Sequence, residues 1–102
     1  MALRNNRMNI PEGPDWTDLM KSADLGGTDG LIGMSEALLS CAADSASAME
    51  YRVEKPADPA GQFGTLQPGE AVKLRGSRSL IHHIVGRGVD GDATGGVENL
   101  DL

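Results

Sequence analysis

Short runs in which apolar and polar residues alternate, separated by glycine- and proline-rich segments, limit the folds open to the second half of the chain. In "MEYRVE" the apolar Met49, Tyr51 and Val53 alternate with charged residues, and in "AVKLR" Val72 and Leu74 do the same. A period of two places one kind of side chain on each face of an extended strand. These runs therefore predict half-buried β-strands.

The segments around these runs also favour a β-unit. Pro68 and Gly69 fit the two central positions of a type II turn, because proline presets φ and glycine tolerates a positive φ. "SLIHHIV" is apolar on both faces, which predicts a central strand, and "VENLDL" predicts a last strand. Residues 49–102 are thus expected to form an antiparallel unit of about four to six strands.

The N-terminal segment shows a different pattern. Residues 1–13 are polar and end at "PEGP", which predicts an extended arm. Pro14 suits the first turn of a helix, and Trp16, Leu19 and Met20 follow at helical spacing. A short helix through "DWTDLMKSADL" is therefore expected.

A second short helix is expected near residues 34–44, because Leu31, Met34, Leu38 and Cys41 keep helical spacing. The fold class that follows is mainly β: a small antiparallel β-sandwich or partial barrel with an extended N-terminal arm that carries one or two short helices. Residues 1–48 would form the arm and residues 49–102 the β-unit.

Charge and composition exclude several classes of partner. The net charge is −6, which gives none of the basic footprint of a nucleic-acid binder. No apolar run approaches the roughly 20 residues of a membrane span. Cys41 is the only cysteine, so no intrachain disulfide can form and a reducing cytoplasm is the expected place of synthesis. Hydrophobic residues make up only 39% of the chain, which favours stabilisation by a partner or by homo-oligomerisation.

Acidic residues near the C-terminus fall at the intervals of an EF-hand calcium loop. Gly95 takes the central turn position, and the ligands would be Asp90, Asp92, Thr94, Glu98 and Asp101. An EF-hand needs flanking helices, however, whereas Gly86 and Gly88 interrupt the segment before the loop and only Leu102 follows it. A glycine-rich turn and a strand is the favoured interpretation, and a calcium-dependent binding module is the alternative.

Catalytic chemistry is not expected. His82 and His83 are adjacent on a predicted strand, so their imidazoles point to opposite faces and cannot share one metal ion. Cys41 lies in the apolar stretch "LLSCAAD", where a buried, inert thiol is the usual outcome. No cofactor is expected apart from calcium in the alternative above.

Large aromatic residues outside regular elements often anchor a chain to a neighbour. Trp16 and Phe63 lie in segments expected to be short or irregular. Together with Arg4 and Arg7 of the arm, they are the candidate partner-binding residues, although each aromatic could instead pack on its own domain.

The stretch "GTLQPGEAVKLRGSRSLIHHIVGRGVDGDATGGVENL" resembles the C-terminal β-unit of small structural proteins from tailed bacteriophage virions. Those proteins carry a hairpin of the form L-x-P-G-E-x-V-x-L, followed by an apolar strand, a glycine-rich turn and a short final strand. The matching residues here are Leu66, Pro68, Gly69, Glu70, Val72 and Leu74. The resemblance covers about a third of the chain.

This resemblance implies a non-enzymatic decoration (cement), neck or tail-associated protein. It would be made in the host cytoplasm and become part of the virion. The expected partners are the major capsid protein or another virion protein, and further copies of the chain itself.

Overall fold

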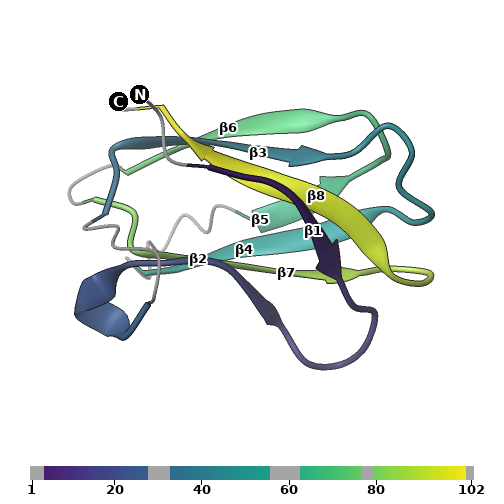
Figure 1. Ribbon diagram of the computed structural model, residues 1–102, viewed down its shortest axis with the longest axis horizontal. Coiled ribbons are helices and arrows are strands. Elements are labelled where there is room, and N and C mark those ends of the chain that lie inside the picture. The colour runs from purple at the N-terminus through teal and green to yellow at the C-terminus, as the bar shows by residue number, and fades with distance from the viewer. Residues whose placement is uncertain (1–3, 28–32, 56–62, 77–79, 101–102) are drawn as a thin grey trace.

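The computed structural model describes residues 4–27, 33–55, 63–76 and 80–100. Within these residues the chain forms eight strands in two four-stranded sheets and one short 3₁₀ turn, η1 (Ala23–Leu25). The first sheet has the order β1-β8-β3-β6 and the second β2-β7-β4-β5, one above the other (Figure 1). The strands are β1 (Arg4–Ile10), β2 (Thr17–Lys21), β3 (Glu36–Cys41), β4 (Met49–Lys55), β5 (Phe63–Leu66), β6 (Ala71–Arg75), β7 (His83–Gly88) and β8 (Ala93–Asn99).

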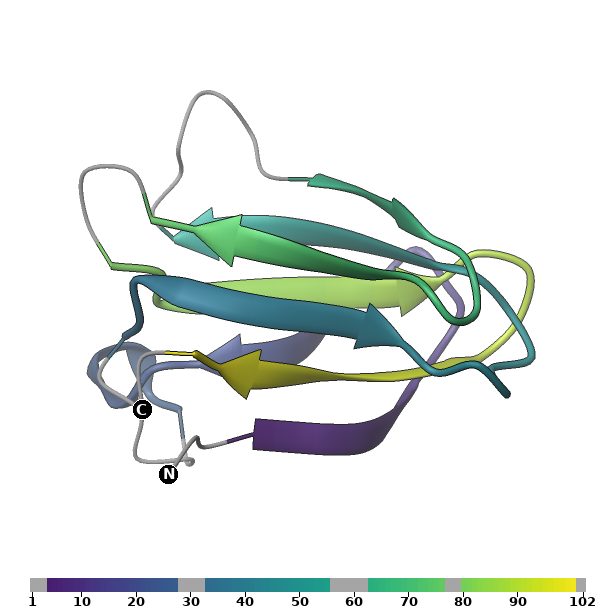
Figure 2. The same ribbon diagram turned by 90° about the horizontal axis from the view of Figure 1, so that it is seen from above.

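The strand pairing follows a regular scheme. β1 pairs with β8, β2 with β7, β3 with β6 and β4 with β5, all antiparallel. Antiparallel β3–β8 and β4–β7 ladders then join these pairs into the two sheets. Figure 2 shows β1 (purple) and β6 (green) at opposite margins of the first sheet. A long antiparallel ribbon wound in this way is a jelly roll, the eight-stranded double Greek key.

The prediction of a mainly β chain is confirmed, whereas the N-terminal arm with helices is wrong. The expected arm is β1, whose Ile10 pairs with Ala93 of β8 and is completely buried. The expected second helix is β3, in which Ala37, Leu39 and Cys41 alternate with less buried residues. The first half of the chain therefore supplies strands to both sheets.

A β-bulge explains the expected helix around Leu19. β2 pairs with β7 with a register shift between Asp18 and Met20. Because a bulge adds one residue to a strand, Leu19 and Met20 are both buried although they are adjacent. With Trp16 three residues earlier, this local break in the period of two produced a spacing that imitates a helix.

The predicted turn at Pro68–Gly69 is present. It connects β5 and β6, which lie in different sheets, so these strands do not form a hairpin. Gly69 has φ +90°, and the N–H of Glu70 donates to the carbonyl of Gln67 at 2.9 Å, as a type II turn requires. The Glu70 carboxylate also accepts from the N–H of Gln67 at 2.7 Å. Since β5 and β6 lie in different sheets, the L-x-P-G-E-x-V-x-L segment is a connection between the two layers.

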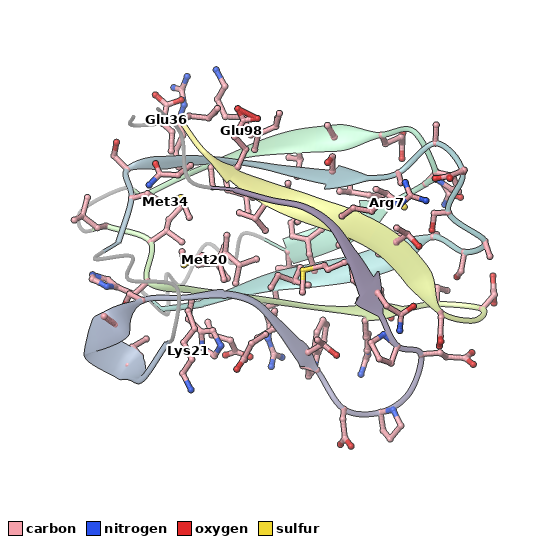
Figure 3. The ribbon with its side chains drawn as sticks, in the orientation of Figure 1. Arg7, Met20, Lys21, Met34, Glu36 and Glu98 are labelled. Atoms are coloured by element: carbon pink, nitrogen blue, oxygen red, sulfur yellow. The ribbon has the colours of Figure 1, made fainter. Side chains whose placement is uncertain are left out.

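The core lies between the two sheets and draws on both halves of the chain. Its fully buried side chains include Ile10, Leu39, Met49, Ile81 and Ile84. In Figure 3 the side chains of Met20 and Met34 point into this space, whereas Glu36, Glu98 and Lys21 point away from it. These charged side chains therefore lie on the outer faces of the sheets.

Candidate partner-binding surface

The outer face of the second sheet carries aromatic and charged side chains on neighbouring strands. Alternation along β4 turns Arg52 away from the core, and alternation along β5 does the same for Phe63 and Thr65. Arg52 pairs directly with Phe63, and Glu50 pairs with Thr65. We call the set of outward residues the aromatic–arginine surface; it consists of Trp16, Glu50, Arg52, Glu54, Phe63, Thr65 and Arg87.

Trp16 is held over this sheet by two guanidinium groups. The Cζ atom of Arg87 lies 4.2 Å from the centroid of the indole ring, and that of Arg52 lies 4.7 Å from it. Arg87 also donates from Nε to the Glu50 carboxylate and from Nη1 to the carbonyl of Pro14, both at 3.2 Å. These cation–π contacts and hydrogen bonds fix the indole before any partner binds.

Phe63 is the exposed member of the surface. Phe63 is 69% exposed and lies on β5, at the opposite edge of the sheet from β2, which Trp16 precedes. An open pocket of about 330 Å³ lies between them, lined by Trp16, Glu50, Tyr51, Arg52, Phe63, Gly64 and Thr65. Burial raises the pKa of the Tyr51 phenol above its ordinary value.

The charges of the surface are balanced. Arg52 donates to the Glu54 carboxylate, and Arg87 to that of Glu50. A free anion would therefore meet guanidinium groups that already have carboxylate partners. The surface thus combines an exposed aromatic side chain with neighbouring arginines whose charges are paired. Anchor residues of protein–protein interfaces have this character, since Trp, Tyr and Arg predominate among them.

The structure brings together two of the four predicted partner-binding residues. Trp16 and Phe63 line the same pocket. Arg4 and Arg7 lie on β1 in the other sheet, where Arg7 donates to the Asp44 carboxylate at 2.7 Å. This hydrogen bond lowers the pKa of Asp44 and raises that of Arg7.

Sequence reasoning missed the two arginines of the surface. Arg52 was only an outward residue of a predicted strand, and Arg87 lay in an expected turn. Their contacts with Trp16 join residues 36 and 71 positions apart in the chain, which no local pattern reports.

The acidic C-terminal residues are not arranged as a calcium loop. Asp90 and Asp92 lie in the turn between β7 and β8, whereas Thr94 and Glu98 lie on β8 itself. In an extended strand, residues four apart are about 13 Å from each other. Asp101 lies outside the described residues, and within those residues no group of three or more Asp, Glu, His or Cys side chains could hold a metal ion. In the structure, a turn that contains Asp90 and Asp92 is followed by strand β8 (Ala93–Asn99).

The turn has structural partners instead. The N–H of Asp90 donates to the Ser47 hydroxyl at 2.9 Å, and the N–H of Glu12 donates to the Asp92 carboxylate at 3.1 Å. The N–H of Thr94 donates to the Ser45 hydroxyl at 2.9 Å. The two serine bonds fasten the β7–β8 turn and the start of β8 to the segment between β3 and β4, and the Glu12 bond fastens the turn to the segment between β1 and β2.

We expect calcium to leave the stability of the protein unchanged, because the described ligands of the loop pattern do not converge. Thermal unfolding followed by circular dichroism in about 1 mM calcium, the range of weak extracellular sites, should match unfolding after chelation. Magnesium at the same ionic strength is the control for charge screening. A calcium-specific rise in the midpoint that is lost in Asp90→Asn would restore the alternative.

The two histidines and the cysteine have separate surroundings. His82 Nδ1 lies 3.0 Å from the Ser22 hydroxyl, whereas His83 Nε2 lies 2.6 Å from the Asp18 carboxylate. His82 precedes β7 and His83 is its first residue, and the two imidazoles have different partners. Cys41 is buried, and its Sγ donates to the carbonyl of Ser47 at 3.6 Å.

Comparisons with known proteins found no matching family model, no matching curated protein and no matching solved structure. In the part of the chain that the structure describes, no helix has the length and apolar character to cross a membrane.

Proposed function

We propose that the chain is a non-enzymatic structural protein of a phage virion that binds another virion protein and self-associates. The major capsid protein is the first partner to test, with the chain acting as a decoration or cement protein on its outer surface. The observation that carries this proposal is Phe63, which is 69% exposed and lines one pocket with an indole that two arginines already hold in place.

The binding free energy would come mainly from the apolar surface of Phe63 that a partner removes from water. A phenylalanine side chain gains roughly 1.5–3 kcal/mol when it is fully removed from water. Trp16 and Arg52 are pre-ordered by their mutual contact, so little side-chain entropy remains to be lost on binding. Prepared aromatic and arginine anchors of this kind account for most of the binding energy at protein interfaces.

The fold supports the same proposal by analogy. Jelly rolls serve as viral capsid domains and also as lectins and cupins, so the fold alone does not select a function. The resemblance of the C-terminal third to virion proteins favours the first of these classes. The chain would then be made in the host cytoplasm and act in the virion.

We expect Phe63→Ser to weaken binding to capsids about 30-fold, the equivalent of roughly 2 kcal/mol for a lost anchor residue. The assay is cosedimentation with heads of the phage that encodes the chain, assembled without this protein. Unfolding in urea should be nearly unchanged, because the ring is mostly exposed in the free protein.

Leu80→Ser is the matched control, since Leu80 is also an exposed apolar side chain, at 43%, and is not among the residues of the pocket. It should bind like the wild type. Equal binding by all three proteins would refute the role of the surface, and failure of the wild type to bind the heads would refute the capsid as partner.

A further inference from the structure

The four edge strands of the two sheets differ in how they are protected against pairing with another strand. Edge strands expose unpaired N–H and C=O groups, and proteins protect them with bulges, charged residues or prolines. β1 has a register shift between Asn5 and Met8, and β2 has one between Asp18 and Met20. Both strands therefore present an irregular edge.

The other two edges are regular, but only one of them carries charge. β6 exposes Lys73 and Arg75. β5, with the sequence Phe63-Gly64-Thr65-Leu66, has no charged residue, no proline and no register shift against β4. Among the four described edges, β5 is the one without a register shift, a charged residue or a proline; it is short, at four residues, and it is also the edge at which Phe63 is exposed.

We propose that the chain self-associates by antiparallel pairing of β5 with β5 of a second copy across a twofold axis. This inference rests on the self-association in the proposed function and names the surface that performs it. The two second sheets would merge into one continuous sheet, so that the outer faces of both copies form a single surface.

The register follows from which side chains share a face. Residues directly opposite in an antiparallel pair must lie on the same side of the sheet. Centring the twofold axis on Gly64 meets this condition, because outward Phe63 then faces outward Thr65 of the second copy. The two Gly64 residues face each other on the inner side, where neither has a side chain that obstructs the approach.

This register also sets the order of side chains along the merged outer face. Arg52 and Glu50 pair with Phe63 and Thr65 within one copy. Across the twofold axis, each row of outward side chains would contain Arg52 and Phe63 of one copy, followed by Thr65 and Glu50 of the second copy. Phe63 of each copy would then lie beside Thr65 of the second copy on the outer face, where both rings remain open to a further partner.

The size of the contact sets its strength. Three residue pairs are far fewer than the 20–30 residues a side of a standard interface, so the free dimer is weak. On a capsid, neighbouring copies meet at high effective concentration, and two joined aromatic–arginine surfaces bind one lattice with avidity.

The test is disulfide trapping between two different variants. Opposite Cα atoms in an antiparallel pair are about 4.5–5.5 Å apart, within the range of about 4.4–6.8 Å that a disulfide spans. A mixture of Phe63→Cys and Thr65→Cys proteins, oxidised at high concentration, should give a cross-linked heterodimer. Its second row keeps the native Phe63 and Thr65. Native Cys41 is buried and should not compete.

Neither variant should cross-link efficiently alone, and a mixture of Thr65→Cys with Leu80→Cys is the control for random collisions. Cross-linking of the Phe63/Thr65 mixture above that control supports the proposal. Equal yields would overturn it, as would preferential cross-linking of Thr65→Cys with itself, which indicates another register. Because no capsid is present, failure here is distinct from failure of the chain to bind heads.

Discussion

Removal of residues 1–13 is expected to unfold the whole domain. This segment contains β1, which pairs along β8 at positions that include Asn9–Thr94 and Ile10–Ala93. Its loss would take the completely buried Ile10 out of the core and leave β8 as an open edge. Burial of one isoleucine is worth roughly 1.5–3 kcal/mol, and the lost strand pairing adds to it. Because a domain has only about 5–15 kcal/mol of stability in total, little or none should remain.

Circular dichroism in a urea titration tests this expectation: the truncated chain should show no cooperative transition. Deletion of residues 1–3 is the matched control, since it leaves β1 (Arg4–Ile10) in place. A truncated protein that unfolds cooperatively at the wild-type midpoint would instead show that β1 is a dispensable arm, as the sequence suggested.

Gly95→Val is expected to destabilise the protein by about 3 kcal/mol or more. Gly95 lies on β8 opposite Cys41 of β3, and a Cβ atom added there would come within 2.3 Å of the Ser40 carbonyl oxygen. It would also approach Met49 Sδ at 3.1 Å. Because the nearest atom belongs to the backbone of a paired strand, a rotamer change cannot relieve the overlap. The β3–β8 ladder itself must shift.

The free energy of unfolding in urea gives the measurement. Thr94→Val is the control on the same strand: it changes a partly exposed neighbour to a similar volume and should shift stability by less than about 1 kcal/mol. A Gly95→Val protein as stable as the control would mean that β3 and β8 are not as closely paired as described here.

The residues around Gly95 also show why the sequence misplaced part of the fold. The segment "GRGVDGDATGG" is rich in glycine, a composition that by itself favours a turn over its whole length. Only its middle is a turn: Gly86 and Gly88 belong to β7, and Gly95 and Gly96 to β8. Gly88 is needed there because a Cβ would lie 1.9 Å from the Gly91 carbonyl oxygen. Glycine can mark a close approach of two backbones as well as a turn, and composition does not separate the two.

The candidate surface was predictable only in its aromatic members. Trp16 and Phe63 attracted attention because the chain has so few large aromatic residues. That they line one pocket depends on β2 and β5 being in the same sheet, of which they are the two edges with β7 and β4 between them. Arg4 and Arg7 were assigned the same role from the sequence. They do not lie on that surface, because β1 belongs to the other sheet.

The sequence by itself determined the strands whose residues alternate without interruption, such as β4 and β6, and the turn at Pro68–Gly69, because these features depend on neighbours only two or three positions away. The tertiary structure decided the rest. It made strands of the first half of the chain by pairing them with β7 and β8, and it placed two arginines on Trp16. Hydrogen bonds between distant strands and burial between two sheets are gained only when the whole roll forms, so no local pattern could reveal them.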